Sequence, residues 1–262
     1  MKRIDILLLQ LCFLPSYVWY MKRMQMGGEE ALSALLVPVC LIIAYLYRKE
    51  NTNVHTNKDN NIALCGVVVY ILCWLISVPA MIKASIAITV LLFYFKLLPH
   101  FGISALAYLS LPWLSSFQYF FGFPLRRFVA EAGALLLNVF GLSVEAQGTG
   151  LSFNGAEVFV DPPCSGVRMI LAILVLTAFA AVVFQCSWKK GIWFGVLALL
   201  MAVLGNVVRA VILFFPESYL VEWPGWTHEG VGLLVYTIVC LVLIWLFNLI
   251  NHDKKIIRTI HR

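Results

Sequence analysis

The chain has 262 residues, of which 62% are hydrophobic and only 12% are charged. A soluble domain of ordinary composition carries about 25% charged residues, so this composition excludes a typical soluble enzyme. Apolar runs near the length of a bilayer crossing recur along the sequence and predict an all-α polytopic membrane protein. The formal net charge of +6 does not indicate a nucleic-acid partner, because the cations gather in short connections and in the C-terminal tail.

Eight apolar runs are candidate transmembrane helices, and we expect them to form a single integral membrane domain over 1–262. The first run has no small-residue cleavage site, so we interpret it as a retained helix rather than a signal peptide. The predicted spans are 4–21, 31–47, 62–82, 84–98, 101–115, 166–186, 191–215 and 230–250.

The distribution of basic residues predicts how the chain is oriented. Lys189 and Lys190 lie between two spans and further cations fill 251–262, so both places should be cytoplasmic. The loops 143–163 and 216–229 contain no Lys or Arg and carry several acidic residues, so they should face outward. We therefore expect a multi-pass protein of the plasma membrane with both termini in the cytoplasm.

The apolar stretch 117–142 follows five predicted crossings, and both of its ends should then lie outside. Arg127, Glu131 and Asn138 form a polar stripe at helical spacing along it, which is typical of a helix lying in the membrane interface. Arg127 and Glu131 can also pair at i,i+4. The alternative interpretation makes 125–142 a span and leaves the preceding apolar run buried or re-entrant.

A short β-hairpin is predicted in the outer loop that follows. Residues 151–153 and 158–160 flank Asn154-Gly155, a dipeptide that favours a two-residue hairpin turn. The hairpin leads the chain directly into the motif around Cys164.

The stretch Asp161–Arg168 reads Asp-Pro-Pro-Cys-Ser-Gly-Val-Arg. Its prolines fix an extended approach, and Ser165 and Gly166 suit the start of a helix. Cys164 is therefore expected at a helix N-terminus, where the macrodipole lowers the pKa of a thiol. Arg168 is four residues further on and would add positive charge on the same face. A structural cysteine at the start of a membrane helix is the alternative.

Cys164, Arg209 and His228 are predicted to meet at the outer side of the membrane. The orientation of the chain that places them there is derived from the loop charges alone. Cys164 begins one span, Arg209 lies near the outer end of the next, and His228 starts the last. Asn206 lies one turn before Arg209 and can orient it. Arginines inside spans are rare and usually mark function. Alternatively, Arg209 is a snorkelling anchor and His228 belongs to an aromatic interface belt.

Cysteine usage favours a reactive thiol at Cys164. The other six cysteines fall within apolar runs or near a predicted cytoplasmic end, so none is an obvious outer partner, and an unpaired outer thiol is a candidate nucleophile. No second ligand lies at metal-binding spacing, so we expect no metal site. These six are Cys12, Cys40, Cys65, Cys73, Cys186 and Cys240.

Taken together, these motifs resemble the exosortase/archaeosortase family of membrane transpeptidases. The resemblance covers roughly 31–250 and is strongest from residue 117 onward. One departure is the Pro162-Pro163 pair before Cys164, where a small residue is more usual. The matching motifs are Pro163–Arg168, Asn206-Val-Val-Arg209, His228 followed by Gly232, and the upstream Phe123–Arg126.

The resemblance implies a mechanism and a substrate class. It implies a thioester on the nucleophile Cys164, with Arg209 and His228 completing the catalytic set, and no cofactor. Arg168, Asn206 and Ser165 would support the site or bind substrate. The implied substrates are secreted proteins that end in a short sorting motif, a hydrophobic helix and a basic tail. They would be cleaved at the outer membrane face and transferred to a surface acceptor, with a lipid or glycan as candidates.

Two other functions remain open from the residues alone. A transporter or channel would use Arg209 and His228 to line a polar path, although few other polar residues fall inside spans. A non-catalytic assembly protein is the second alternative. Under the enzymatic interpretation, 1–115 holds N-terminal helices, 116–163 the interfacial helix and hairpin, 164–250 a catalytic three-helix core, and 251–262 a cytoplasmic basic tail.

Overall fold

The computed structural model describes residues 10–26, 57–218 and 226–260, together with positions 39, 42, 43, 46 and 224. Most of the predicted span 31–47 and the first part of 4–21 therefore lie outside the described residues. The chain divides into two compact units. The first comprises Met1–Trp113 and Ala181–Gly191, and the second comprises Leu114–Ala180 and Ile192–Arg262.

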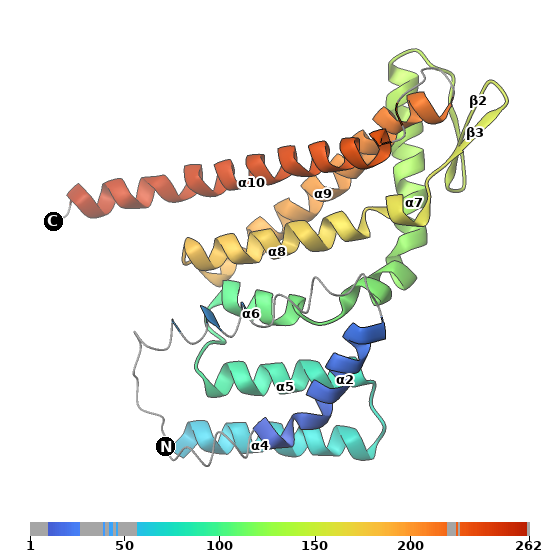
Figure 1. Cartoon of the computed structure of the whole chain (residues 1–262). Coiled ribbons are helices and arrows are strands. Elements are labelled where there is room, and N and C mark those ends of the chain that lie inside the picture. The colour runs from blue at the N-terminus through green and yellow to red at the C-terminus, as the bar shows by residue number, and fades with distance from the viewer. Residues whose placement is uncertain are drawn as a thin grey trace. The chain divides into compact units, whose positions relative to one another are not determined.

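The first unit is helical and packs around a small aromatic core. Phe13, Tyr70, Ala87 and Val90 are buried together, and the ring of Phe13 meets that of Tyr70 edge to face. In the same core the hydroxyls of Tyr70 and Ser16 lie 2.7 Å apart. Its helices are α2 (Leu14–Met26), α4 (Asn57–Leu75), α5 (Ala80–Tyr94) and α6 (Phe101–Leu109), shown in Figure 1.

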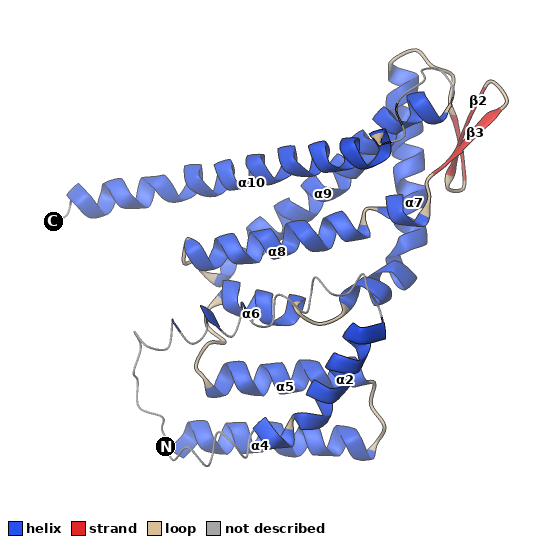
Figure 2. Ribbon diagram, viewed as in Figure 1, coloured by secondary structure: helices blue, strands red, loops and turns tan. Residues whose placement is uncertain are grey.

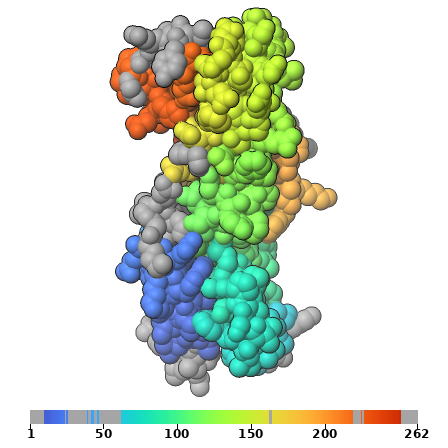
Figure 3. All heavy atoms as spheres, turned by 90° about the vertical axis from the view of Figure 1, so that its right-hand side faces the viewer, coloured from blue at the N-terminus to red at the C-terminus, as the bar shows by residue number. Residues whose placement is uncertain are grey.

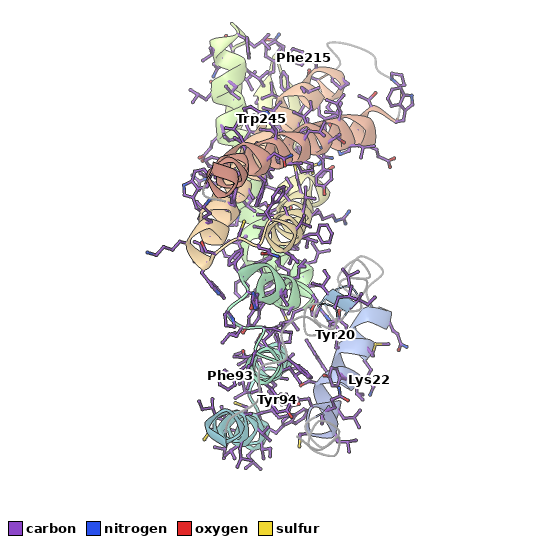
Figure 4. All side chains as sticks on the ribbon, turned by 90° about the vertical axis from the view of Figure 1, so that its left-hand side faces the viewer. Tyr20, Lys22, Phe93, Tyr94, Phe215 and Trp245 are labelled. Carbon is purple, nitrogen blue, oxygen red and sulfur yellow. The ribbon has the colours of Figure 1, made fainter. Side chains whose placement is uncertain are left out.

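A second tie in this unit joins α2 to the end of α6. Tyr20, labelled on α2 in Figure 4, donates its hydroxyl to the backbone carbonyl of Ser110 over 2.9 Å. Ser110 is buried, so this bond satisfies a carbonyl that water cannot reach.

The second unit combines four long helices with a small sheet (Figure 2). The elements of the second unit are α7 (Trp113–Val139), β1 (Glu145–Gln147), β2 (Gly150–Phe153), β3 (Ala156–Phe159), the 3-10 helix η2 (Pro162–Ser165), α8 (Val167–Val183), α9 (Trp188–Glu217) and α10 (Thr227–Ile260). The end of α8, the start of α9 and the turn between them belong to the first unit.

The expected eight spans are more than the described helices supply. Among the described residues, two helices are long and apolar enough to cross a membrane, Trp188–Glu217 and Thr227–Ile250. A crossing of about 30 Å needs about 20 residues, and the nine residues of α6 reach only about 14 Å. The helices Ile62–Leu75, Ala80–Tyr94 and Val167–Val183 are apolar but shorter.

The predicted runs 62–82 and 84–98 extend past the ends of α4 and α5 because apolar composition does not reveal a turn. Ser77 and Lys96 adopt positive φ angles of 54° and 58°, a conformation that a helix cannot continue through. Pro79 then precedes the first residue of α5 and fixes its own φ at −52°. The chain is thus a mostly helical protein whose exposed apolar surface, including Trp245 of α10 in Figure 4, suits a lipid environment.

The predicted hairpin is confirmed, and a third strand joins it. In the antiparallel pair β2 and β3, Phe153 faces Ala156 across the turn. Asn154 and Gly155 have φ angles of 50° and 82°, as a type I′ turn requires. Strand β1, which the sequence did not predict, pairs with the other edge of β2.

Helix α7 packs its small and aliphatic residues against this sheet. Val129, Ala130 and Leu137 are buried with Leu151 of β2 and Phe214 of α9. In Figure 1 this helix runs across the ends of α8 and α10 rather than alongside them, and Figure 3 shows its end together with the sheet on one face. The prediction that it lies in the membrane interface stays a prediction.

The polar stripe of α7 serves two purposes. Arg127 donates to Glu131 over 2.8 Å, which confirms the predicted i,i+4 pair. Asn138 instead holds the turn after the helix, because its amide donates to the carbonyl of Val144 and its carbonyl accepts from the Val144 N–H. Within the stripe, Arg127 and Glu131 form an exposed ion pair, whereas Asn138 caps the C-terminal turn of the helix.

Small residues let α9 lie close to its neighbours in the helical core. Ala198 and Ala202 are fully buried and pack with Ile173 of α8 and Leu243 of α10. A Cβ at Gly205 would come within 2.8 Å of the Met169 side chain. Close packing of this kind is typical of helices in membranes. It fixes the relative positions of the three helices that carry the polar residues of the site.

Candidate active site

Cys164 lies in a short 3-10 turn before α8 rather than in the helix itself. Its N–H donates to the carbonyl of Asp161 over 2.8 Å within η2. Gly166 then adopts a left-handed φ of 83°, and α8 begins at Val167. The predicted position at the first turn of the helix is therefore wrong, because the left-handed glycine separates the cysteine from the helix.

The structure brings the three predicted residues together. Sγ of Cys164 lies 3.1 Å from Nε2 of His228. Nη2 of Arg209 lies 3.1 Å from the same Nε2 and 3.8 Å from Sγ. The turn before α8, the last part of α9 and the start of α10 thus each supply one group to a single polar cluster.

Asn206 supports the nucleophile and not, as predicted, the arginine. Its side-chain amide donates to the backbone carbonyl of Cys164 over 3.0 Å. Asn206 is only 2% exposed, so this bond anchors the cysteine turn to α9 from inside the protein. A Cβ at Gly166 would lie 2.8 Å from the Asn206 amide, so the glycine leaves room for this contact.

Ser165 and Arg168, the two other predicted supporting residues, differ in burial. Ser165 is buried, and its hydroxyl donates to Oε1 of Gln118 over 3.1 Å, which ties the cysteine turn to α7. Arg168 is exposed on the first turn of α8. The expected i,i+4 relationship with Cys164 fails because the two residues do not share one helix.

Glu217 belongs to the cluster and was missed by sequence reasoning. Its Oε1 lies 3.3 Å from Nδ1 of His228, on the opposite side of the ring from Cys164. Both side chains of this pair are partly exposed, at 41% for His228 and 37% for Glu217. In the sequence Glu217 was one of several acidic residues in an outer loop, and only its place at the end of the arginine-bearing helix could have singled it out.

Burial raises the pKa of the Cys164 thiol above its ordinary value. The positive charge of Arg209 acts in the opposite direction, while the carboxylates of Glu217 and Asp161 raise the pKa further. The net direction is therefore upward, opposite to the lowering expected from a helix N-terminus. Forming the nucleophilic thiolate in this site calls for a base beside the sulfur.

The contacts of His228 fit that requirement. A guanidinium can only donate, so Nε2 acts as an acceptor toward Arg209 and also faces the thiol. The neutral ring then carries its proton on Nδ1, and this N–H donates a hydrogen bond to the carboxylate of Glu217. This arrangement can take the thiol proton at Nε2 and leave a cation between two anionic groups.

Comparison with known proteins assigns the chain to a family. A family model described as transmembrane exosortase matches residues 6–245. The chain belongs to the transmembrane exosortase family. No curated protein and no solved structure matches it.

Family membership confirms the resemblance drawn from the motifs and the identification of an integral membrane protein. The matched region contains every member of the polar cluster. No group of three or more metal-binding side chains occurs among the residues that the structure describes in this exosortase.

Proposed function

We propose that this exosortase is a cysteine transpeptidase or peptidase that cleaves secreted proteins at a C-terminal sorting signal. The supporting observation is the 3.1 Å contact between Sγ of Cys164 and Nε2 of His228, with Arg209 beside both atoms. A nucleophile in contact with its base is what covalent catalysis requires. The family resemblance supplies the substrate class, which is a short motif followed by a hydrophobic helix and a basic tail.

In the first half-reaction, Nε2 of His228 takes the proton of the Cys164 thiol as sulfur attacks the carbonyl carbon of the scissile amide. The new C–S bond gives a tetrahedral oxyanion. As the C–N bond breaks, the imidazolium returns its proton to the leaving amine. The products are a thioester on Cys164 and the released hydrophobic tail.

In the second half-reaction, an acceptor with an N–H or O–H group attacks the thioester. His228 now takes the proton of the acceptor, the C–S bond breaks to release the Cys164 thiolate, and the imidazolium returns the proton to sulfur. Water as acceptor makes the enzyme a peptidase, while a lipid or glycan nucleophile makes it a transpeptidase. The proposed acceptor is a lipid or glycan at the cell surface.

Arg209 supplies the positive charge that the oxyanion needs. Its Nη2 lies 3.8 Å from Sγ, which leaves it beside the carbon that sulfur attacks. A fixed cation in a partly buried site stabilises developing charge far better than it would in water. When the thiol proton moves to Nε2, Arg209 loses its acceptor on His228 and becomes free to donate to the oxyanion.

We further propose that the site faces outward in a multi-pass protein of the plasma membrane, with α7 in the interface and both termini cytoplasmic. Labelling with an impermeant thiol reagent in a cysteine-free background tests this orientation. Ser143→Cys in the acidic loop should react in intact cells, and Lys189→Cys in the first turn of α9 should react only after permeabilisation. Labelling of Ser143→Cys only after permeabilisation would contradict the proposal.

The transporter and the non-catalytic assembly protein are the competing functions. In a transporter, Arg209 and His228 would face a path through the bilayer. In this chain Nε2 of His228 and Nη2 of Arg209 both face the sulfur of Cys164. This geometry favours the enzyme.

Trapping the acyl-enzyme is the decisive experiment. A tagged secreted protein from the same cell, ending in motif, apolar helix and basic tail, should be processed by the wild-type enzyme. It should also yield a hydroxylamine-sensitive adduct. Cys164→Ala and Cys164→Ser should accumulate in the membrane and give neither product nor adduct, while Cys65→Ala serves as the control. Normal processing by Cys164→Ala would refute the proposed function.

A further inference from the structure

The side of the His228 ring that faces away from the nucleophile is occupied by a carboxylate. Nδ1 of His228 lies 3.3 Å from Oε1 of Glu217, the last residue of α9. Arg209 lies on the same helix and contacts the other ring nitrogen. One helix therefore contacts both nitrogens of the imidazole, which sits on the first turn of α10.

These two contacts together select one protonation state of the ring. The guanidinium of Arg209 has only donors, so its 3.1 Å contact makes Nε2 an acceptor. An ionised carboxylate has only acceptors, so Glu217 makes Nδ1 the protonated nitrogen. The ring is thereby held as the Nδ1–H tautomer, whose Nε2 lone pair faces the thiol of Cys164.

We infer that Glu217 is a positioning residue that holds His228 in the tautomer able to accept the thiol proton. The inference rests on the proposed cysteine mechanism and adds a fourth residue to it. When the proton moves from Sγ to Nε2, the imidazolium comes to lie between a thiolate and the Glu217 carboxylate. The carboxylate stabilises this cation without taking the proton itself, as in other triads of nucleophile, histidine and acid.

The partial exposure of the pair makes the inference testable. Exposed ion pairs contribute little to the stability of a fold, so removing this one should leave the protein folded. Glutamine has nearly the shape of glutamate but can donate through its amide. Where the amide N–H faces Nδ1, the ring must carry its proton on Nε2, which points a proton instead of a lone pair at the thiol. Where the amide oxygen faces Nδ1, this neutral acceptor stabilises the imidazolium less than a carboxylate does.

A matched control separates hydrogen bonding from charge. Asp161 is the other carboxylate whose charge acts on Cys164, and its side chain makes no capping hydrogen bond in η2. Asp161→Asn removes the same charge as Glu217→Gln but leaves the His228 contact intact. A role that acts only through charge on the thiol predicts that the two variants change the rate in the same direction.

The experiment compares Glu217→Gln, Glu217→Asp and Asp161→Asn in the processing assay. We expect Glu217→Gln to slow processing on the order of 10²–10⁴-fold. Glu217→Asp, which keeps the carboxylate, should recover part of the rate. Asp161→Asn should stay within about threefold of the wild type. A Glu217→Gln enzyme within about threefold of wild type, alongside an inactive Cys164→Ala, would overturn this inference alone.

A second readout does not depend on any substrate. The nitrogen chemical shifts of ¹⁵N-labelled histidine distinguish the two tautomers in the purified protein, and the spectrum of His228→Gln identifies the signals of that residue. The wild type should show Nδ1 protonated, and Glu217→Gln should shift His228 toward the Nε2–H form. An unchanged tautomer in Glu217→Gln would overturn the inference whatever the outcome of the processing assay.

Discussion

Gly232 of α10 lies against the guanidinium of Arg209. A Cβ atom at this glycine would come within 3.1 Å of Nε and 3.3 Å of Cζ of that arginine. Gly232 follows His228 by one turn of the same helix, so the missing side chain lets the guanidinium reach across α10 to the histidine ring. Nε of Arg209 is buried and has no hydrogen-bond partner among the described residues. Its position is therefore set by packing and by the contacts of Nη2.

We predict that Gly232→Ala slows processing by about tenfold or more while the protein still accumulates. The added methyl group must displace the guanidinium by a few tenths of an ångström, which moves Nη2 away from His228 and from the oxyanion. Misplacement of catalytic groups by about 1 Å can cost about 10²-fold. The rate is measured with the tagged substrate in isolated membranes.

Gly195→Ala is the matched control for this variant. Gly195 lies inside α9, and apart from the adjacent backbone of that helix no described residue lies within 4 Å of the position that an added methyl group would take. Alanine there should leave activity unchanged and raise helix stability slightly, by about 0.5–1 kcal/mol. Equal activity in the two alanine variants would show that Gly232 does not position the arginine.

Arg209→Lys should lower the processing rate by about 10²-fold or more. Nη2 reaches both Nε2 of His228 and the region of Sγ from a planar group that lies against Gly232, and a flexible ammonium is not held in that position. Loss of one oxyanion donor typically costs about 10²–10³-fold. Arg127→Lys provides the control, because that arginine forms an exposed pair with Glu131 that lysine can keep. Comparable losses in both variants would count against a catalytic role for Arg209.

Gly166→Ala should unfold at a lower temperature than Gly148→Ala. Both glycines have positive φ, at 83° and 64°, so alanine strains either backbone by about 1–2 kcal/mol. Only at Gly166 does the new methyl group also meet Asn206, at 2.8 Å, and there it disturbs the amide that holds the Cys164 carbonyl. Thermal unfolding of the purified variants measures the difference. Equal melting temperatures would mean that the contact between the new methyl group and Asn206 does not lower the stability of the fold.

The sequence predicted the members of the site better than their local surroundings. Apolar runs and loop charges were sufficient to bring Cys164, Arg209 and His228 to one end of three helices, because each lies next to the end of a long apolar segment. Asn154-Gly155 predicted the hairpin, since its turn type depends on those two residues alone. Glu217 escaped notice because an acid just beyond an apolar run looks like any loop charge until the partner helix is in place.

Other features depend on tertiary structure that local patterns do not encode. Strand β1 has three residues, too few for an alternating pattern, and forms only because β2 offers a free edge. The helices end at turns such as the one at Ser77, which hydropathy does not register. Likewise the environment of the Cys164 thiol is set by burial, which opposes the helix-end effect that the motif suggested.

The protonation state of Cys164 gives the last prediction. Burial raises the pKa of this thiol, and Arg209 is the charge that opposes the rise. In a variant that keeps Cys164 as its only cysteine, the rate of alkylation by iodoacetamide should increase with pH through a midpoint above about 8.5, the value of an unperturbed thiol. The same variant denatured in detergent is the reference and should titrate near that value.

The same charges predict the direction in which two substitutions shift the alkylation midpoint of Cys164. Arg209→Gln removes the cation that favours the thiolate, so the midpoint should move to higher pH and alkylation at neutral pH should slow. Asp161→Asn removes a carboxylate that disfavours the thiolate, so its midpoint should move to lower pH. A folded-state midpoint below that of the denatured protein would indicate a preformed thiolate–imidazolium pair. In that case His228 would act first as the acid that protonates the leaving amine, and not as the base that removes the thiol proton.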